Sequence, residues 1–412
     1  MSVATTADGP VQAAQKAARQ ATVVVAVGVA CALHIGKLPV AIPPLQTALG
    51  LSLLQAGFLL SLVQLAGMTL GLLVGLAADR LGPRRVMLTG LLLLALGSGL
   101  GALAGDVKVL LWTRALEGFG FLLTVLPAPG LMRLCVQHPP TLARALGWWG
   151  AYMPVGAALA LMLGAPLIGL IGWRGLWVLL ALVALCAAGL LWRVVPAAVS
   201  PPAALDAPRL WPRLRSTLSA PGPWLMALGF FCYSGQWLAV VGFLPTIYSQ
   251  AGVGSVALGA LSALAAGINM LGNVGAGRLL ARGARPGALL AVGYGAMALG
   301  GLVAFGAVGH PWAQYGAVLL FSSVGGLIPG TLFGLAVVLA PGKETVSTTV
   351  GWMQQWSALG QFTGPPLVAW LATQAGGWQW TGLFTGACSL AGLVLAWRLQ
   401  RVWAGRYTAA RL

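Results

Sequence analysis

The chain has 412 residues, of which 59% are apolar and only 7% are charged. A soluble domain carries about 25% charged residues, so this composition, with a mean hydropathy of +0.90, excludes an ordinary water-soluble protein, a disordered chain and a disulfide scaffold. The formal net charge of +17 would suit a nucleic-acid-binding protein, but the basic residues lie in short loops between apolar runs, so no nucleic acid is expected. The five cysteines are scattered and form no CxxC pair, so neither a metal site nor a cofactor is expected.

Twelve apolar runs follow one another along the chain, each long enough to cross a bilayer as a helix, which needs about 20 residues. They are too long for barrel strands of about 10 residues, so the sequence predicts an all-α integral membrane protein. The runs lie at 21–44, 53–78, 86–105, 108–132, 142–169, 173–195, 222–248, 256–280, 286–308, 312–340, 346–372 and 378–400.

A proline-rich stretch divides these runs into two sets of six. Residues 196–221 contain six prolines, which remove backbone donors and block helix formation, so we expect a polar linker there. The predicted organisation is listed in chain order: an N-terminal tail (1–20), an N-terminal six-helix bundle (21–195), the cytoplasmic linker (196–221), a C-terminal six-helix bundle (222–400) and a C-terminal tail (401–412).

Basic residues are divided unequally between the two sides of the membrane. If the N-terminus is cytoplasmic, its side receives 19 lysines and arginines, and the opposite side receives only Lys108 and Arg174. By the positive-inside rule, both termini are then cytoplasmic and the number of spans is even. We therefore expect a multi-pass protein of the cell inner membrane, whose anionic lipid accounts for the high positive charge.

The two halves also resemble each other. Gly172-Trp173-Arg174 opens the sixth span, and a similar turn at 377–379 opens the twelfth, 205 residues later. Proline interrupts the fourth span at Pro127 and the tenth span at Pro329. Repeated halves with interrupted helices are typical of secondary transporters, although chance similarity among glycine- and proline-rich helices is the alternative.

The loop after the second span carries the most specific motif of the chain. It reads Gly75-Leu76-Ala77-Ala78-Asp79-Arg80-Leu81-Gly82-Pro83-Arg84-Arg85. This resembles the G-x3-D-R-x-G-x-R-R loop of the major facilitator superfamily, and 114–118 resembles the fourth-span R-x-x-x-G element of the same family. The resemblance covers essentially the whole chain and implies twelve transmembrane helices in two pseudo-symmetric six-helix bundles that rock between two states.

The resemblance also implies a gating role for this loop. Gly75 allows close helix packing, Asp79 ends a helix, and Gly82 makes a tight turn, while the basic residues Arg80, Arg84 and Arg85 complete the motif, the last two near the inner headgroups. Together they would lock the cytoplasmic ends of the halves in the outward-open state. A plain positive-inside loop is the alternative.

A narrower resemblance involves three further segments. Leu33–Pro39, Phe243–Tyr248 and 325–329 resemble the cyanate/nitroimidazole-type branch of the superfamily. This chain has Lys37 where that branch typically has arginine. In the fifth span, Ala-Pro at 165–166 stands where the antiporter hallmark has Gly-Pro, which weakens a drug-efflux interpretation.

Three ionisable side chains lie inside the predicted spans: Lys37, Arg114 and Glu117. Each costs about 2.5–3.5 kcal/mol to insert, so such residues are candidates for function. All three lie at a similar depth, and together they carry a net charge of +1. We therefore predict a small anion as solute, with Lys37 as its primary contact, Arg114 as the second, and Glu117 as both the balancing partner and the proton-coupling group. The alternative is that Arg114 and Glu117 brace helices together.

Polar and aromatic side chains inside other spans are the further candidates for the solute cavity. They are His34, Gln64, Tyr152, Tyr233, Gln236, Trp237, Asn269 and Gln354. Each of them could instead be a helix-packing hydrogen bonder or an interfacial anchor. Tyr233, Gln236 and Trp237 form the strongest group, because they lie within one turn of the seventh span.

The sequence therefore predicts a monomeric secondary active transporter of a small anionic solute, with proton symport as the expected coupling. Efflux of hydrophobic drug-like compounds is the alternative within transport. A membrane enzyme is disfavoured because no nucleophile–His–acid set or phosphate loop appears, and a non-transporting sensor would usually carry a sizeable soluble domain.

Overall fold

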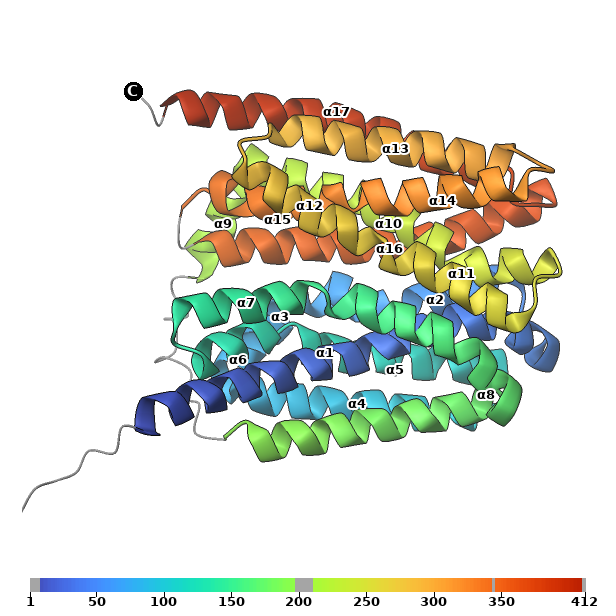
Figure 1. Cartoon of the computed structure of the whole chain (residues 1–412), viewed down its shortest axis with the longest axis horizontal. Helices are drawn as coiled ribbons and strands as arrows, with labels where there is room; N and C mark the ends of the chain where they lie inside the picture. The colour runs from blue at the N-terminus through green and yellow to red at the C-terminus, as the bar shows by residue number, and fades with distance from the viewer. Residues whose placement is uncertain (1–7, 197–209, 343–344, 410–412) are drawn as a thin grey trace, which may run out of the picture.

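The computed structural model describes residues 8–196, 210–342 and 345–409, and the described chain is helical throughout (Figure 1). The elements are α1 (Asp8–Leu49), α2 (Leu53–Ser61), η1 (Leu62–Gln64), α3 (Leu65–Leu81), α4 (Pro83–Ala102), α5 (Val107–Val125), α6 (Ala128–Cys135), α7 (Pro139–Gly150), α8 (Tyr152–Val194), α9 (Leu210–Ser219), α10 (Pro221–Gln250), α11 (Ser255–Gly267), α12 (Asn269–Ala281), α13 (Pro286–Gly306), α14 (Pro311–Gly325), α15 (Leu327–Leu339), α16 (Val346–Ala375) and α17 (Thr381–Ala409).

The helices form two bundles that lie side by side. Figure 1 places α1–α8, here called the N-half, below α10–α17, here called the C-half. Helix α1 begins and α17 ends at the same end of the molecule, which we call the terminal end; the opposite end is the distal end. This arrangement confirms the predicted architecture of two helical bundles.

Ten helical stretches among the described residues are long and apolar enough to cross a membrane. One of them, α8, consists of two arms divided at Gly172, whose φ of +71° only glycine adopts readily. Helix α16 has 30 residues and is more polar, but it packs along α10 in the same bundle. Counting both arms of α8 and adding α16 gives twelve crossings in the described part of the chain.

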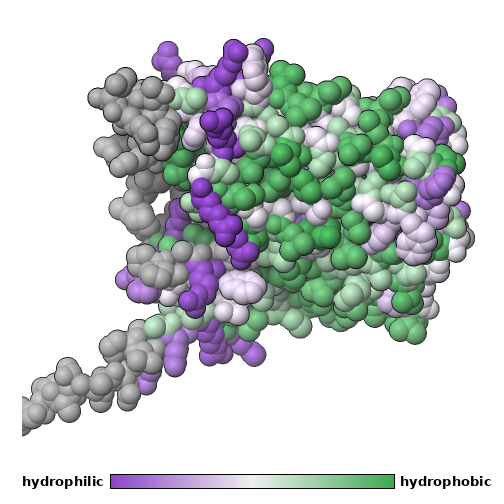
Figure 2. Space-filling view, turned by 45° about the horizontal axis from the view of Figure 1, so that its top comes forward, coloured by the Kyte–Doolittle hydropathy of each residue, from purple (hydrophilic) through white to green (hydrophobic). Residues whose placement is uncertain are grey.

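The surface matches this topology. Figure 2 shows a broad hydrophobic band between hydrophilic residues gathered at the terminal end and at the distal end. Leucines in the middle of the spans are widely exposed, for example Leu92 (54%), Leu182 (53%) and Leu299 (57%). Such a broad apolar surface is the kind that a bilayer covers.

Two predicted boundaries differ from the structure. The first helix is longer than the expected 21–44, since α1 continues past Pro43 and Pro44 to Leu49. Part of the expected linker is also helical, because α9 occupies Leu210–Ser219. Its only proline, Pro212, lies in the first turn, where the missing N–H has no intrahelical partner to lose. The part of the linker at 197–209 lies outside the described residues.

The apolar cores show where the halves meet. One core cluster joins Leu38 of the N-half to Phe243 and Val368 of the C-half, and another joins Val40 to Val241. These α1 residues belong to the distal part of the helix. The two largest core clusters each remain within one half among the described residues. The two halves are therefore sealed against each other by apolar contacts at the distal end.

Candidate functional site

The buried lysine and the buried glutamate meet inside the N-half. The Lys37 Nζ, on α1, donates to Glu117 Oε1, on α5, in a short ion pair. It also donates to Ser98 Oγ of α4 at 2.9 Å and lies 4.3 Å from the Trp177 ring centroid of α8. The His34 Nδ1, one turn earlier on α1, is 3.5 Å away. Lys37 thus has partners on four helices of the N-half.

Arg114 completes the same cluster from the preceding turn of α5. Its Nη1 donates to Glu117 Oε2 at 2.7 Å and to the His34 backbone oxygen at 2.7 Å. Its Nε donates to the Leu59 backbone oxygen of α2 at 3.1 Å. One carboxylate therefore accepts from two cations, one on each oxygen, and the guanidinium links α5 to α1 and α2.

Local sequence explains why these helices approach so closely. His34 and Lys37, like Arg114 and Glu117, are three residues apart and therefore share a helix face. A Cβ at Gly97 of α4 would lie 3.0 Å from the Glu117 backbone nitrogen, so a larger residue would push α4 away from α5. The glycine therefore brings Ser98 within reach of the lysine.

The cluster is almost completely shielded from solvent. The exposed fractions are 0% for His34 and Lys37, 2% for Arg114 and 1% for Glu117. With neutral histidine, two cations and one carboxylate leave a charge of +1. Removing one partner of a buried ion pair is costly because the remaining charge stays desolvated. The two cations can therefore leave the Glu117 carboxylate at low cost only if another anion takes its place.

Two polar atoms of the cluster have no hydrogen-bond partner among the described residues: His34 Nε2 and Arg114 Nη2. Buried polar groups are otherwise nearly always paired. These atoms supply further donor or acceptor capacity beside the carboxylate. The arrangement can therefore hold a proton or accept a small anion.

In the C-half, three of the predicted residues form a second polar group. Tyr233 of α10 donates through its hydroxyl to Asn269 Oδ1 of α12 at 3.1 Å, and Asn269 Nδ2 donates to the Ser322 backbone oxygen of α14 at 2.7 Å. Trp237 Nε1 donates to Ser322 Oγ at 3.1 Å. Gln236 points elsewhere: its Oε1 accepts from Ser389 Oγ of α17 at 3.1 Å.

The remaining predicted residues are dispersed. Gln64 Nε2 donates across the two halves to Gln361 Oε1 at 3.0 Å. Tyr152 stacks on Trp149, with ring centroids 4.3 Å apart. Gln354 is exposed, whereas its neighbour Gln355 is the residue that reaches the other half.

Several residues that the structure places in these groups were not predicted from the sequence. Ser98 and Trp177 contact Lys37, and Ser322 joins Asn269 to Trp237. They carry no charge, and serine and tryptophan occur widely in apolar helices. Only the position of Ser98 next to Gly97 offered a signal, as a small polar pair in an otherwise leucine-rich span.

The motif that was predicted to gate transport lies only partly within the residues whose side chains the structure describes. Gly75, Asp79 and Arg80 lie in α3, but their side chains are outside the described residues. Gly82 has a φ of +87° and precedes the first turn of α4, as a tight turn requires. Arg84 Nη2 donates to the Trp192 backbone oxygen of α8 at 2.7 Å, so it ties α4 to the same half. Arg85 is exposed.

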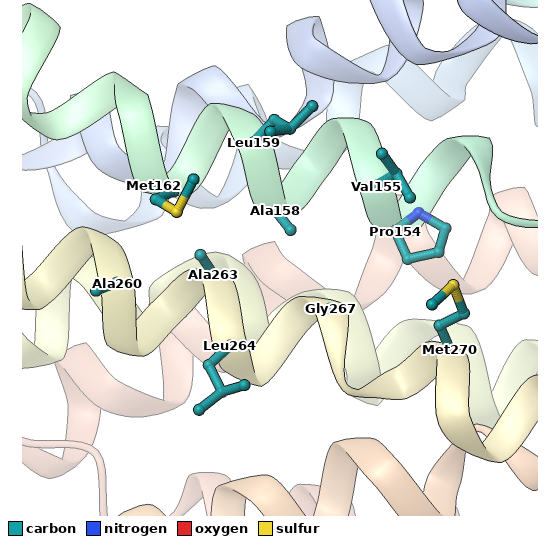
Figure 3. Close-up of a pocket in the computed structure, with 10 residues that line it drawn as sticks. All are labelled: Pro154, Val155, Ala158, Leu159, Met162, Ala260, Ala263, Leu264, Gly267 and Met270. Atoms are coloured by element: carbon teal, nitrogen blue, oxygen red, sulfur yellow. The ribbon is translucent and has the colours of Figure 1, made fainter.

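A groove runs between the halves where α8 passes α11 and α12 (Figure 3). It has a volume of about 410 Å³ and is lined by apolar side chains, among them Ala158 and Met162 on one side and Ala263 and Met270 on the other. No group of three or more His, Cys, Asp or Glu side chains with metal-binding geometry occurs in the part of the chain that the structure describes.

Comparison with known families identifies the chain. Residues 22–365 match the model of the Major Facilitator Superfamily. The chain belongs to the major facilitator superfamily. Human monocarboxylate transporter 11 is 30% identical in an alignment of 338 residues that covers 76% of this chain and 68% of the human protein. The chain is thus a multi-pass membrane transporter.

A shorter match and two solved structures add to these comparisons. The puromycin resistance protein pur8 of Streptomyces alboniger is 35% identical over 136 residues, which are 33% of this chain and 27% of that protein, so the match spans about a quarter of that relative. The D-xylose-proton symporter superposes with a TM-score of 0.74 at 16% identity, covering 92% of this chain and 96% of that one. A bacterial homologue of the human lysosomal transporter Spinster, inward-facing and unoccupied, gives a TM-score of 0.71 at 17% identity, covering 94% and 98%. These two structures support the fold.

Proposed function

We propose that this superfamily member is a proton-coupled transporter of a small anionic solute, and that Glu117 carries the proton. The observation that supports this most directly is the sharing of one buried carboxylate between Lys37 and Arg114. Two fixed cations with a single exchangeable negative partner make a site at which an anion and a carboxylate compete.

The charge of the cluster determines whether proton binding favours or opposes anion binding. With Glu117 ionised, the cluster carries +1. When an anion takes the place of the carboxylate beside the cations, Glu117 has lost both ionic partners and is stabilised by a proton. The cluster then carries two cations and one anion, which is again +1. Anion and proton therefore bind cooperatively, and each favours the other by the same free energy.

In the described conformation, Lys37 does not face the other half. Its Nζ is enclosed by α4, α5 and α8, while the adjacent Leu38 packs against the C-half. The expected direct contact between solute and Lys37 thus requires the solute to enter the N-half or α1 to turn. We propose that this turn is part of the transport cycle.

The orientation follows from the charge distribution of the sequence. With 19 basic residues on the side of the termini and two on the other, the terminal end is proposed to be cytoplasmic in the inner membrane. The apolar seal at the distal end would then close the outside, and the gating loop would lie on the cytoplasmic side.

Two resemblances support an anionic solute. The human relative is named a monocarboxylate transporter, and the first-span segment around Lys37 resembles the cyanate/nitroimidazole-type branch. Both favour a small solute that a basic side chain can recognise. A monocarboxylate is therefore the first class to test.

Uptake into proteoliposomes tests the proposal. Radiolabelled lactate, acetate and cyanate are offered with and without an inwardly directed proton gradient. Wild type should accumulate at least one of them with the gradient; Glu117→Gln should lose the gradient-driven part, and Lys37→Ala should lose uptake. Asp106→Asn, an acid-to-amide change at the exposed start of α5, is the matched control and should transport normally. Equal gradient-driven uptake by wild type and Glu117→Gln would refute the coupling role.

Efflux of apolar compounds is the second candidate. It is favoured by the apolar groove between α8 and α11 (Figure 3) and by the partial match to a puromycin resistance protein. Expression in a drug-sensitive host separates the two functions, because drug resistance should survive Lys37→Ala whereas anion uptake should not.

A further inference from the structure

A second cavity lies inside the C-half at the distal end. It has a volume of about 480 Å³, in the range of small-molecule sites. The end of α10, the start of α14 and the loop before α17 contribute to its wall. We call it the distal pocket; the residues used in the argument are Leu244, Tyr248, Phe305, Tyr315, Val318 and Trp378. Every residue that lines it belongs to the C-half, so it is separate from the Glu117 cluster.

The walls of the distal pocket are aromatic, and its deeper part, here called the floor, holds one aromatic and one aliphatic side chain. Tyr248 and Tyr315 face each other with ring centroids 6.4 Å apart at 66°. Phe305 and Val318 are buried, at 7% and 4% exposure, and form the deeper part. Flat aromatic molecules pack well against such edge-to-face walls.

The polar groups of the distal pocket limit the kind of ligand. None of the described residues that line it is charged. Four side-chain donors are already used within the protein. Tyr315 Oη donates to the Leu261 backbone oxygen at 3.1 Å and Gln314 Nε2 to the Ala304 oxygen at 3.0 Å. Trp378 Nε1 donates to the Gln250 side chain at 2.8 Å and Gln379 Nε2 to the Ala375 oxygen at 2.9 Å.

One buried donor in this wall has no partner among the described residues. The Tyr248 hydroxyl is buried and has no hydrogen-bond partner among the described residues. A buried hydroxyl without a partner costs stability, which a ligand acceptor would recover. We infer that the distal pocket binds a neutral aromatic molecule that carries a hydrogen-bond acceptor, with the Tyr248 hydroxyl as the donor.

The pocket also adjoins the distal seal between the halves. Trp378 forms part of its wall and packs on Phe243, with ring centroids 5.1 Å apart. Phe243 belongs to the core cluster that includes Leu38 of the N-half. A molecule in the distal pocket therefore contacts a wall that also supports the closed distal end. The binding experiment accordingly addresses the conformation in which the distal end is closed.

Benzophenone is the probe for this site. It has two aromatic rings, one carbonyl acceptor and no charge, and on irradiation it labels nearby C–H bonds. The full chain in lipid nanodiscs is irradiated with increasing benzophenone, and the labelled peptides are identified by mass spectrometry. Saturable labelling is expected in the peptides that contain Leu244 and Val318. Labelling that is unsaturable and spread over both halves would overturn the inference.

Three variants test the geometry. Tyr248→Phe keeps the ring and removes the hydroxyl, so half-saturation should need about 3- to 10-fold more benzophenone, as expected for one hydrogen bond. Tyr315→Phe is the matched control, because its hydroxyl is already bonded to backbone, and it should stay within about twofold. Val318→Trp fills the floor and should abolish saturable labelling, with an unchanged far-ultraviolet circular dichroism spectrum verifying the fold.

Competition distinguishes the proposed ligand from a lipid chain. Diphenylmethane, which has the two rings without the carbonyl, should compete equally weakly in wild type and Tyr248→Phe. If oleic acid displaces benzophenone from both proteins with the same efficiency, and the two proteins bind benzophenone equally, the pocket is an acyl-chain site and the inference is wrong.

Discussion

Neutralising Glu117 should destabilise the N-half more than any other single acid-to-amide change in the described chain. Glu117→Gln leaves Lys37 and Arg114 buried, at 0% and 2% exposure, and raises the cluster charge from +1 to +2. The amide has one acceptor oxygen and one donor group, so one of the two cations must face a donor. Breaking a buried pair on one side costs about 3–5 kcal/mol, and we expect a loss of this size in the free energy of unfolding.

Tryptophan fluorescence in mixed micelles with increasing dodecyl sulfate measures this change, since the chain has 17 tryptophans. Asp106→Asn is the control on the same helix: its side chain caps α5 by accepting from the Val109 N–H at 2.9 Å, and asparagine caps almost as well. Its cost should stay below about 0.5 kcal/mol.

A double-mutant cycle then isolates the pair. Adding Lys37→Met to Glu117→Gln removes one of the two stranded cations, so the double variant should be more stable than Glu117→Gln alone by at least about 1 kcal/mol. If Glu117→Gln costs no more than Asp106→Asn, or if the two changes simply add, the buried ion cluster does not hold the N-half together and the reasoning fails.

Three further changes test the contacts between helices. An ideal Cβ at Gly267 would lie 3.6 Å from that of Ala158, within the about 3.5–4.5 Å range of a disulfide; in a chain without its native cysteines, A158C/G267C should therefore cross-link the halves and stop transport until it is reduced. Gln64→Ala removes the 3.0 Å bond to Gln361 and should lower the unfolding free energy by about 1 kcal/mol, unless water replaces the bond without cost. Gly364→Ala would place a Cβ against a backbone oxygen of α10 and should cost about 1–3 kcal/mol by the same assay; a neutral result would mean that α16 can move aside.

The sequence predicts the positions of the spanning helices well, because each must have an apolar run long enough to cross the bilayer. The sixth span was predicted to begin at Gly172-Trp173-Arg174, and the structure divides α8 there, with a positive φ at Gly172. The break near Pro127 was likewise expected, and α5 ends at Val125. The helix α9 was not predicted. A proline is compatible both with the first turn of a helix and with an irregular linker, so the composition of this stretch does not distinguish the two.

The sequence predicts how deep the candidate residues lie in the membrane, but it does not predict which way their side chains point. Lys37 and Glu117 lie at similar depths on neighbouring helices, so their proximity could be anticipated. The direction in which Lys37 points could not be anticipated, because rotating α1 by one residue would exchange Lys37 with Leu38, which faces the C-half. The contribution of Ser98 depends on how closely α4 packs at Gly97, and the distal pocket depends on side-chain packing among helices far apart in sequence.

Counting the protons taken up with each bound anion tests the central claim most directly. The anion that gives the largest thermal stabilisation is titrated calorimetrically in buffers with different ionisation enthalpies, which yields the number of protons bound per anion. Cooperative binding at Glu117 predicts about one proton per anion in wild type and none in Glu117→Gln. Uptake of no proton by wild type, or of the same number by both proteins, would contradict the account.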